Sequence, residues 1–286
     1  MKNKFLQRLI TGAVLVAIVV GFFFLRLVDV SLFSILIALF AIIGTYELSS
    51  KLFIFKYTDG VGKIDTNGTS VTQFFLTIVS AFVIVPAYEI FGPITLVSVI
   101  LSEVLISSLV AIIGKKGMDG VKKGWLSAIY PKVLLASLLF SNALKDNALF
   151  ALILTFIVSS CTDTFAYIVG SSLKGPKLCP KISPNKTVSG AIGGLLGGVI
   201  ATVVLYFIVP PVTNIKNDWI IFVALGIVCS ILTQVGDIFE SHIKRSIGIK
   251  DMGNILPGHG GVLDRVDGTM FASVAIALTM TILALI

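Results

Sequence analysis

Long apolar segments separated by short polar ones run through almost the whole chain. A helix needs about 20 apolar residues to cross a bilayer, and nine segments reach or approach that length: 10–27, 30–47, 70–88, 92–113, 130–144, 147–170, 188–209, 218–236 and 267–286. The fifth is short, and the sixth is long and carries polar residues. The pattern predicts an all-α polytopic membrane protein with about nine transmembrane helices.

Composition supports this class. The 286 residues are 56 % hydrophobic and 13 % charged, with a mean hydropathy of +1.02, whereas soluble domains carry about 25 % charged residues. The first apolar run is longer than the core of a signal peptide, and no small-x-small cleavage site follows it, so we expect a retained helix. The three cysteines are odd in number and imply no disulfide framework.

The net charge of +7 could suggest a nucleic-acid partner, but its placement indicates topology. If the N-terminus is cytoplasmic and all nine segments span, nineteen Lys and Arg residues, Lys132 among them, fall on the cytoplasmic side. Only Arg26, Lys145 and Lys216 fall outside. This is the asymmetry of the positive-inside rule, so we expect a cytoplasmic N-terminus and no nucleic-acid partner.

Residues 1–145 are expected to anchor the protein and could supply dimer contacts. Glu103 lies within an apolar segment, where an acid is costly and is functional or paired. It could be paired with Ser107 or Ser108. The basic segment 114–130 could form a separate interfacial helix.

A polar segment, Gly236–Gly268, interrupts the apolar pattern of residues 146–286. It holds five of the fifteen acids, four of the twenty-two Lys and Arg residues and both histidines. Helical spacing places four polar side chains on one face, namely Asp237, Glu240, Ser241 and Lys244. Asp264 and Asp267 share a face if the next helix begins near Leu263.

This mixture of residue types suits phosphate chemistry. Carboxylates at two helix ends suit a hard divalent cation, and Lys or Arg side chains neutralise phosphate charge. Gly260, Gly261 and their neighbours would let backbone N–H groups approach an anion. The segment therefore predicts a phosphoryl or nucleotidyl transfer site, in a polar cavity that faces the cytoplasm.

Two further segments belong to this prediction. Asp163 shares a helix face with Tyr167 and Gly170, either as a wall of the polar cavity or as a hydrogen-bonded acid within the bundle. The loop 171–190 contains three prolines and cannot form a continuous helix.

Lys186, with Thr187 and Ser183, would contact phosphate at the end of this loop, beside a helix N-terminus. In the following helix, glycines at four-residue spacing from Gly190 to Gly198 indicate close helix packing rather than a phosphate loop.

At these residues the chain resembles a known family. The runs Ser241-His-Ile-Lys-Arg, Lys250-Asp-Met-Gly, Leu256-Pro-Gly-His-Gly-Gly and Asp264-Arg-Val-Asp267 look like the signature of phosphatidate cytidylyltransferases, also called CDP-diacylglycerol synthases. The run Ser183-Pro-Asn-Lys-Thr-Val-Ser-Gly190 resembles a second family motif. It departs from that motif at Asn185, Val188 and Ser189.

The resemblance implies transfer of the cytidylyl group of CTP to phosphatidic acid, giving CDP-diacylglycerol and pyrophosphate. It also implies a divalent cation such as Mg²⁺, which a monovalent cation could join, and a location in the bacterial inner (plasma) membrane with the active site cytoplasmic. A homodimer is plausible.

The site residues expected on this basis fall into four groups. The metal ligands would be Asp237, Asp264 and Asp267. The catalytic residues would be Asp237, Asp264, Lys186, Lys250 and Arg265. Substrate would contact Ser183, Lys186, Thr187, Ser241, Lys244, Arg245, His259, Gly260 and Gly261. A second tier comprises Asp163, Asp251 and Glu240.

The alternatives come from other classes. A polytopic cation-coupled transporter could use the intramembrane acids as a cation path, although most acids lie near helix ends. An enzyme that uses CDP-alcohols would carry a motif that begins with Asp-Gly. The Asp-Gly pairs in this chain are not followed by the rest of that motif. A scaffold that has kept the fold without activity is the third alternative.

Overall fold

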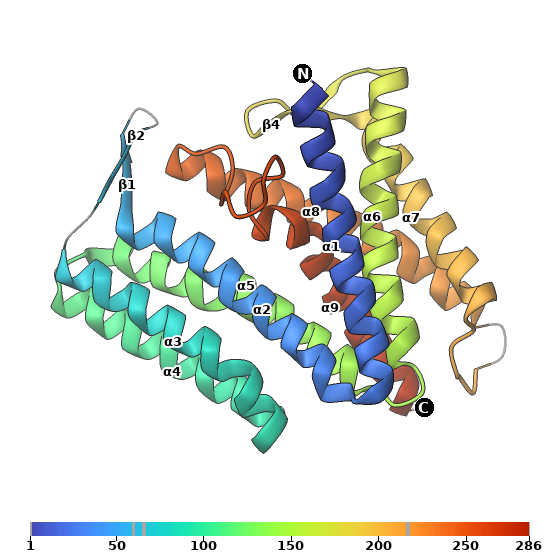
Figure 1. Cartoon of the computed structure of the whole chain (residues 1–286), viewed down its shortest axis with the longest axis horizontal. Coiled ribbons are helices and arrows are strands. Elements are labelled where there is room, and N and C mark those ends of the chain that lie inside the picture. The colour runs from blue at the N-terminus through green and yellow to red at the C-terminus, as the bar shows by residue number, and fades with distance from the viewer. Residues whose placement is uncertain (1, 59–60, 65–66, 216–217, 286) are drawn as a thin grey trace. The chain divides into compact units, whose positions relative to one another are not determined.

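The structure, a computed structural model, describes residues 2–58, 61–64, 67–215 and 218–285. Within those ranges the chain is mostly helical (Figure 1). The helices are α1 (Lys2–Val28), α2 (Val30–Ser49), α3 (Gly68–Phe91), α4 (Ile94–Ile113), α5 (Gly117–Ala143), α6 (Ala148–Leu173), α7 (Val188–Ile208), α8 (Trp219–Ile247) and α9 (Leu263–Leu285). The shorter elements are a π-helical turn η1 (Ser50–Ile54) and the strands β1 (Phe55–Thr58), β2 (Val61–Ile64), β3 (Lys177–Cys179) and β4 (Ser183–Thr187).

The described helices are long enough to cross a bilayer. Their lengths run from 20 residues in α2 and α4 to 29 in α8, which at about 1.5 Å per residue matches a hydrocarbon core of roughly 30 Å. Nine of them meet the length and hydropathy of a membrane span. The prediction of an all-α polytopic membrane protein is confirmed.

Two predicted boundaries need correction. The segment 130–144 is only the second half of α5, which begins at Gly117 and continues through Pro131. A separate interfacial helix at 114–130 is therefore wrong; neighbouring helices allow proline inside a spanning helix. Two of the connecting segments contain strands: β1 pairs with β2 and β3 with β4, in two antiparallel hairpins.

The chain forms two compact units, which we describe separately. One comprises Met1–Ala136 and Ser246–Asp264, and the other Ser137–Arg245 and Arg265–Ile286. Three helices, α5, α8 and α9, contribute residues to both units. The assignment of anchoring to residues 1–145 and catalysis to 146–286 stays a prediction.

In the first unit, α1 packs on α2, α2 on α3 and α3 on α4. Glu103 of α4 is buried and forms an ion pair with Lys132 of α5, with 2.7 Å between Oε1 and Nζ. Thr77 and Ser80 of α3 donate hydrogen bonds to the same carboxylate. Lys132 is therefore a buried partner of Glu103 rather than a cytoplasmic loop charge, and the expected pairing of Glu103 with Ser107 or Ser108 is wrong. Pairing inside the bundle lowers the cost of both charges.

In the second unit, α6 and α7 pack closely along the glycine face of α7. A Cβ on Gly194 would lie 2.9 Å from the backbone oxygen of Thr162, and a Cβ on Gly193 would lie 2.5 Å from Val169 Cβ. The predicted packing role of these glycines is confirmed. An apolar core with Phe150 and Phe222 in edge contact continues from α6 to α7, α8 and α9.

Candidate functional site

Lys186 is held by the β3–β4 hairpin at the start of α7. The side chain of Thr187 caps α7 by accepting the backbone N–H of Gly190 at 3.1 Å, the role that Thr commonly takes at a helix N-cap. The backbone N–H of Val188 donates to Pro176 O at 3.0 Å and closes the hairpin. These contacts fix the base of the strand that carries Lys186.

Lys186 forms an ion pair with Asp237, and 2.6 Å separate Nζ from Oδ2. Asp237 lies on the polar end of α8, where Ser241 Oγ donates to Asp237 Oδ1 at 3.3 Å. Both charged side chains keep partial solvent access, 23 % for Lys186 and 35 % for Asp237. The structure thus brings together two residues that lie 51 positions apart. Both had been predicted to belong to one site.

Two further carboxylates surround this pair. The negative charge of Asp237 acts on both Asp163 of α6 and Asp267 of α9, and Lys186 acts on Asp163. Asp267 is nearly enclosed, and its Oδ1 accepts the N–H of Gly268. Three carboxylates in one region concentrate negative charge, which a bound cation or basic side chains would offset.

Glycines allow this gathering of carboxylates. A Cβ on Gly236 of α8 would lie 2.6 Å from the backbone oxygen of Asp267, and one on Gly268 would lie 2.7 Å from Thr233. The two helices therefore approach so closely that a side chain does not fit. Thr269 of α9 also donates to Ser159 of α6 at 3.1 Å. These contacts set the positions of Asp163, Asp237 and Asp267.

A cavity of about 740 Å³ opens beside the pair. Its charged lining consists of Asp163, Asp237, Lys174, Lys177 and Lys186. Lys174 ends α6 in a left-handed conformation (φ 55°), and its backbone oxygen accepts the hydroxyl of Ser189. From the sequence, Lys174 and Lys177 were included only among the nineteen cytoplasmic charges, because their spacing around the prolines does not indicate that they share a cavity.

The other polar residues of α8 make contacts within the protein. Lys244 forms an ion pair with buried Glu240 at 3.2 Å, and its charge also acts on Asp267. Arg245 Nε donates to the backbone oxygen of Ile182 at 3.3 Å and connects α8 to the hairpin loop. The predicted substrate contacts of Lys244 and Arg245 stay predictions. The charge of Arg265 acts on Asp163.

The glycine-rich part of the polar segment belongs to the first unit. Asp264 Oδ2 accepts the backbone N–H groups of Met252 at 2.9 Å and Gly261 at 2.8 Å. Gly258 and Gly260 take positive φ angles of 75° and 88°, which only glycine adopts easily. Asp264 therefore holds the loop before α9 in place through its hydrogen bonds to Met252 and Gly261. The side chains of Lys250 and Asp251 are exposed, and that of His259 is half-buried.

Glu47 of α2 holds the start of α9, a role that the sequence did not predict. Its buried carboxylate accepts the backbone N–H of Val262 at 3.0 Å and of Leu263 at 2.8 Å, at the start of α9. A negative charge is favourable at a helix N-terminus. The sequence offered one indication of this role, an acid at the last position of the apolar segment 30–47. The apolar residues around it made it look like an ordinary helix end.

Carboxylate oxygens are suitable ligands for a divalent cation, and Asp163, Asp237 and Asp267 provide them in one region. Among the residues that the structure describes, no three His, Cys, Asp or Glu side chains are grouped closely enough to hold a metal ion by themselves. The metal set Asp237, Asp264 and Asp267 stays a prediction. Lys216 lies outside the described residues.

Together, the fold and the site define a helical membrane protein with acids and lysines gathered at the ends of its spanning helices. The cytidylyltransferase family model matches residues 6–283. The chain belongs to this family.

Relatives from three bacteria bear the name phosphatidate cytidylyltransferase. The one from Rickettsia conorii is 31 % identical over 222 residues, which are 72 % of this chain and 91 % of the relative. The one from Staphylococcus haemolyticus is 35 % identical over 133 residues, 46 % of this chain and 50 % of the relative. The one from Mycobacterium bovis is 47 % identical over 68 residues, 24 % of this chain and 22 % of the relative.

Proposed function

We propose that the protein transfers the cytidylyl group of CTP to phosphatidic acid, giving CDP-diacylglycerol and pyrophosphate. Membership of the cytidylyltransferase family supports nucleotidyl transfer, and the names of the relatives support this pair of substrates. The observation that carries the proposal is the Lys186–Asp237 pair on a cavity of about 740 Å³.

The residues of the cavity suit a triphosphate. Lys174, Lys177 and Lys186 line it, and their ammonium groups would contact phosphate oxygens of CTP. Asp237 and Asp267 would offer carboxylate oxygens to a divalent cation such as Mg²⁺, with the charge of Asp163 beside Asp237, and phosphate oxygens of CTP and water would complete its ligands. When bound, that cation would supply charge neutralisation at the α-phosphate and at the departing pyrophosphate. Ligation of the same cation by Asp264 stays a prediction.

The reaction requires no covalent intermediate with the protein. An oxygen of the lipid phosphate forms a bond with the α-phosphorus of CTP, and the bond from that phosphorus to the β-phosphate oxygen breaks, so pyrophosphate leaves. The attacking oxygen is already anionic near neutral pH, so no general base is needed. The chain would contribute positioning and electrostatic stabilisation. Lys186 is suited to both roles because it lines the cavity and contacts Asp237.

The membrane setting is part of the proposal. The acyl chains of phosphatidic acid would stay in the bilayer while the headgroup enters the cavity. The excess of Lys and Arg on alternate loops supports a cytoplasmic active site, and the bacterial relatives support the inner membrane of a bacterium. The buried Glu103–Lys132 pair is closed by hydrogen bonds and does not resemble an open cation path.

The test is a transfer assay on purified protein in detergent, with labelled CTP and phosphatidic acid. Labelled CDP-diacylglycerol should form with Mg²⁺ and disappear when a chelator removes it. Asp237→Asn should lower the rate by roughly 100-fold or more, the usual scale for losing a key electrostatic group.

Asp146→Asn is the matched control, since Asp146 is an exposed acid between α5 and α6. It should keep the wild-type rate. Absence of product with wild-type protein would refute the substrates, whereas full activity of Asp237→Asn would refute the site alone.

A further inference from the structure

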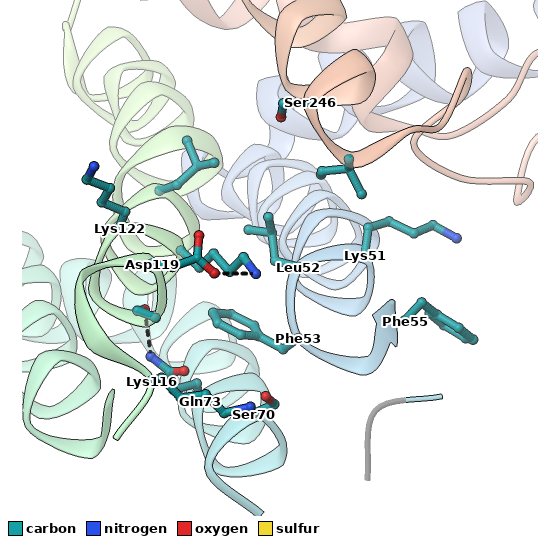
Figure 2. Close-up of a pocket in the computed structure, with 14 residues that line it drawn as sticks. Lys51, Leu52, Phe53, Phe55, Ser70, Gln73, Lys116, Asp119, Lys122 and Ser246 are labelled. Carbon is teal, nitrogen blue, oxygen red and sulfur yellow. Dashed lines mark hydrogen bonds and ion pairs between the residues drawn. The ribbon is translucent and has the colours of Figure 1, made fainter. Parts of the chain in front are cut away.

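A second cavity, of about 580 Å³, lies within the unit formed by Met1–Ala136 and Ser246–Asp264. Its lining comes from η1 and the first residue of β1, from the first turns of α3, from Lys116 and the first turns of α5, and from the last residues of α8 (Figure 2). Its volume falls in the usual range for small-ligand pockets, roughly 300–1,000 Å³. It shares no residue with the cavity at Lys186 and Asp237.

The charges of this pocket are unbalanced. Its charged lining residues are Lys51, Lys116, Lys122, Lys123 and Asp119, so four cations meet one anion and the formal excess is three positive charges. Asp119 forms an ion pair with Lys123 at 2.8 Å, drawn as a dashed line in Figure 2. Lys51 lies over the Phe55 ring, 5.2 Å from its centroid. Asp119 is the acid of the lining, and the charge of Lys51 also acts on Glu47 outside it, so the excess of three positive charges is that of the lining residues alone.

A polar floor gives the pocket a defined shape. Gln73 of α3 is buried, and its Nε2 donates to Ser107 Oγ of α4 at 3.0 Å and to the backbone oxygen of Gly120 at 3.1 Å. One side chain thus joins α3, α4 and α5 beneath the lysines. A pocket whose walls are already connected loses less conformational entropy when it binds a ligand.

The turn before α5 adds to the positive potential. Lys115 and Gly117 both have positive φ angles, 54° and 61°, so the chain reverses between α4 and α5 within three residues. A left-handed conformation is unfavourable for a residue other than glycine, so the surrounding contacts must hold Lys115 in it. The turn starts α5 directly after Lys116, and the N-terminus of a helix carries a partial positive charge.

The pocket lies at one end of its helices. Successive spanning helices run in opposite directions, so the end of α2 and the starts of α3 and α5 fall at the same membrane face. Lipid headgroups lie at the ends of spanning helices. Basic pockets between spanning helices are suited to anionic headgroups, and each Lys side chain near a membrane surface strengthens such binding.

We propose that this lysine-lined pocket is a second anion site, which binds a phosphate group from the headgroup of an anionic phospholipid or from a soluble phosphate compound. Its position among helix ends favours the lipid. The proposal does not depend on the reaction catalysed at the other cavity.

Native mass spectrometry of the purified protein in neutral detergent tests this proposal. Dioleoyl phosphatidylglycerol should bind, and dioleoyl phosphatidylcholine, which carries no net charge, should bind more weakly. The triple variant Lys116→Gln/Lys122→Gln/Lys123→Gln should bind phosphatidylglycerol at least about tenfold more weakly. Asp119→Asn should bind it more tightly, because it removes the single acid of the lining.

Single variants provide the matched control. Lys122→Gln should weaken binding, whereas Lys145→Gln, which neutralises an exposed lysine between α5 and α6, should not. Binding of inorganic phosphate or pyrophosphate that depends on the same lysines, without binding of phosphatidylglycerol, would assign the site to a soluble anion. Equal binding of both ligands by the triple variant and by Lys145→Gln would overturn the proposal.

Discussion

Glu47 Oε2 lies 2.8 Å from the backbone nitrogen of Leu263, the first residue of α9, although 216 positions separate the two residues. The other carboxylate oxygen of Glu47 accepts the N–H of Val262. A side chain of α2 thus closes the start of the helix that carries Asp264 and Asp267. Asp264, in turn, holds the preceding loop through Met252 and Gly261.

Replacing Glu47 should therefore impair both stability and activity. Glu47→Ala leaves two buried N–H groups without their acceptors, at about 1–3 kcal/mol each, and should lower the melting temperature. Glu47→Gln keeps one acceptor oxygen and should be intermediate. If Glu47 positions Asp264, the turnover number should fall more than the affinity for CTP, measured well below the melting temperature. Loss of stability with unchanged turnover would limit Glu47 to a structural role.

Gly253 should not tolerate a side chain. A Cβ at this position would lie 2.1 Å from Glu47 Oε1 and 2.6 Å from its Cδ, so Gly253→Ala must displace the buried carboxylate. We expect a fall in activity comparable with that of Glu47→Ala. Gly248→Ala is not a suitable control, because Gly248 has a positive φ of 83°. Gly21→Ala is suitable, because its Cβ would meet no atom within 4 Å; wild-type behaviour of Gly253→Ala would contradict the close contact.

Lys186→Gln should reduce cytidylyl transfer strongly, by about 100-fold, because it removes the cation that contacts Asp237. Lys181→Gln, in the same loop but exposed and outside the cavity lining, should stay near the wild-type rate. Steady-state kinetics with CTP as the varied substrate provides the measurement. Equal rates for the two variants would exclude Lys186 from the site.

The Glu103–Lys132 pair predicts a non-additive pair of mutations. Lys132→Met leaves a buried carboxylate uncompensated and should destabilise the protein by about 3–5 kcal/mol, whereas the double variant Glu103→Leu/Lys132→Met should recover most of the loss. Thermal unfolding in detergent would measure both variants. Additive losses in the double variant would show that the two charges do not depend on one another.

The apolar pattern was sufficient to predict nine spanning helices, because crossing a bilayer requires a length and a hydrophobicity that the residues show directly. The pairing of Lys186 with Asp237 agrees with the assignment of both residues to one site, but that assignment drew on the family resemblance as well as on residue type. Lys132 was misplaced, because a lysine near a segment end looks the same whether it reaches water or a buried acid. Glu47 and Lys174 were missed for a related reason: their partners are backbone groups or distant residues, and a single sequence carries no record of tertiary contacts.

Lys132 also has a consequence for how the protein reaches the membrane. A lysine near the middle of an isolated spanning helix raises the free energy of insertion by about 2.5–3.5 kcal/mol. Its neutralising acid is on the preceding helix, joined by a three-residue turn. We therefore expect α4 and α5 to leave the translocon together as a helical hairpin. A glycosylation-tag assay should show that α5 inserts inefficiently alone and efficiently behind α4.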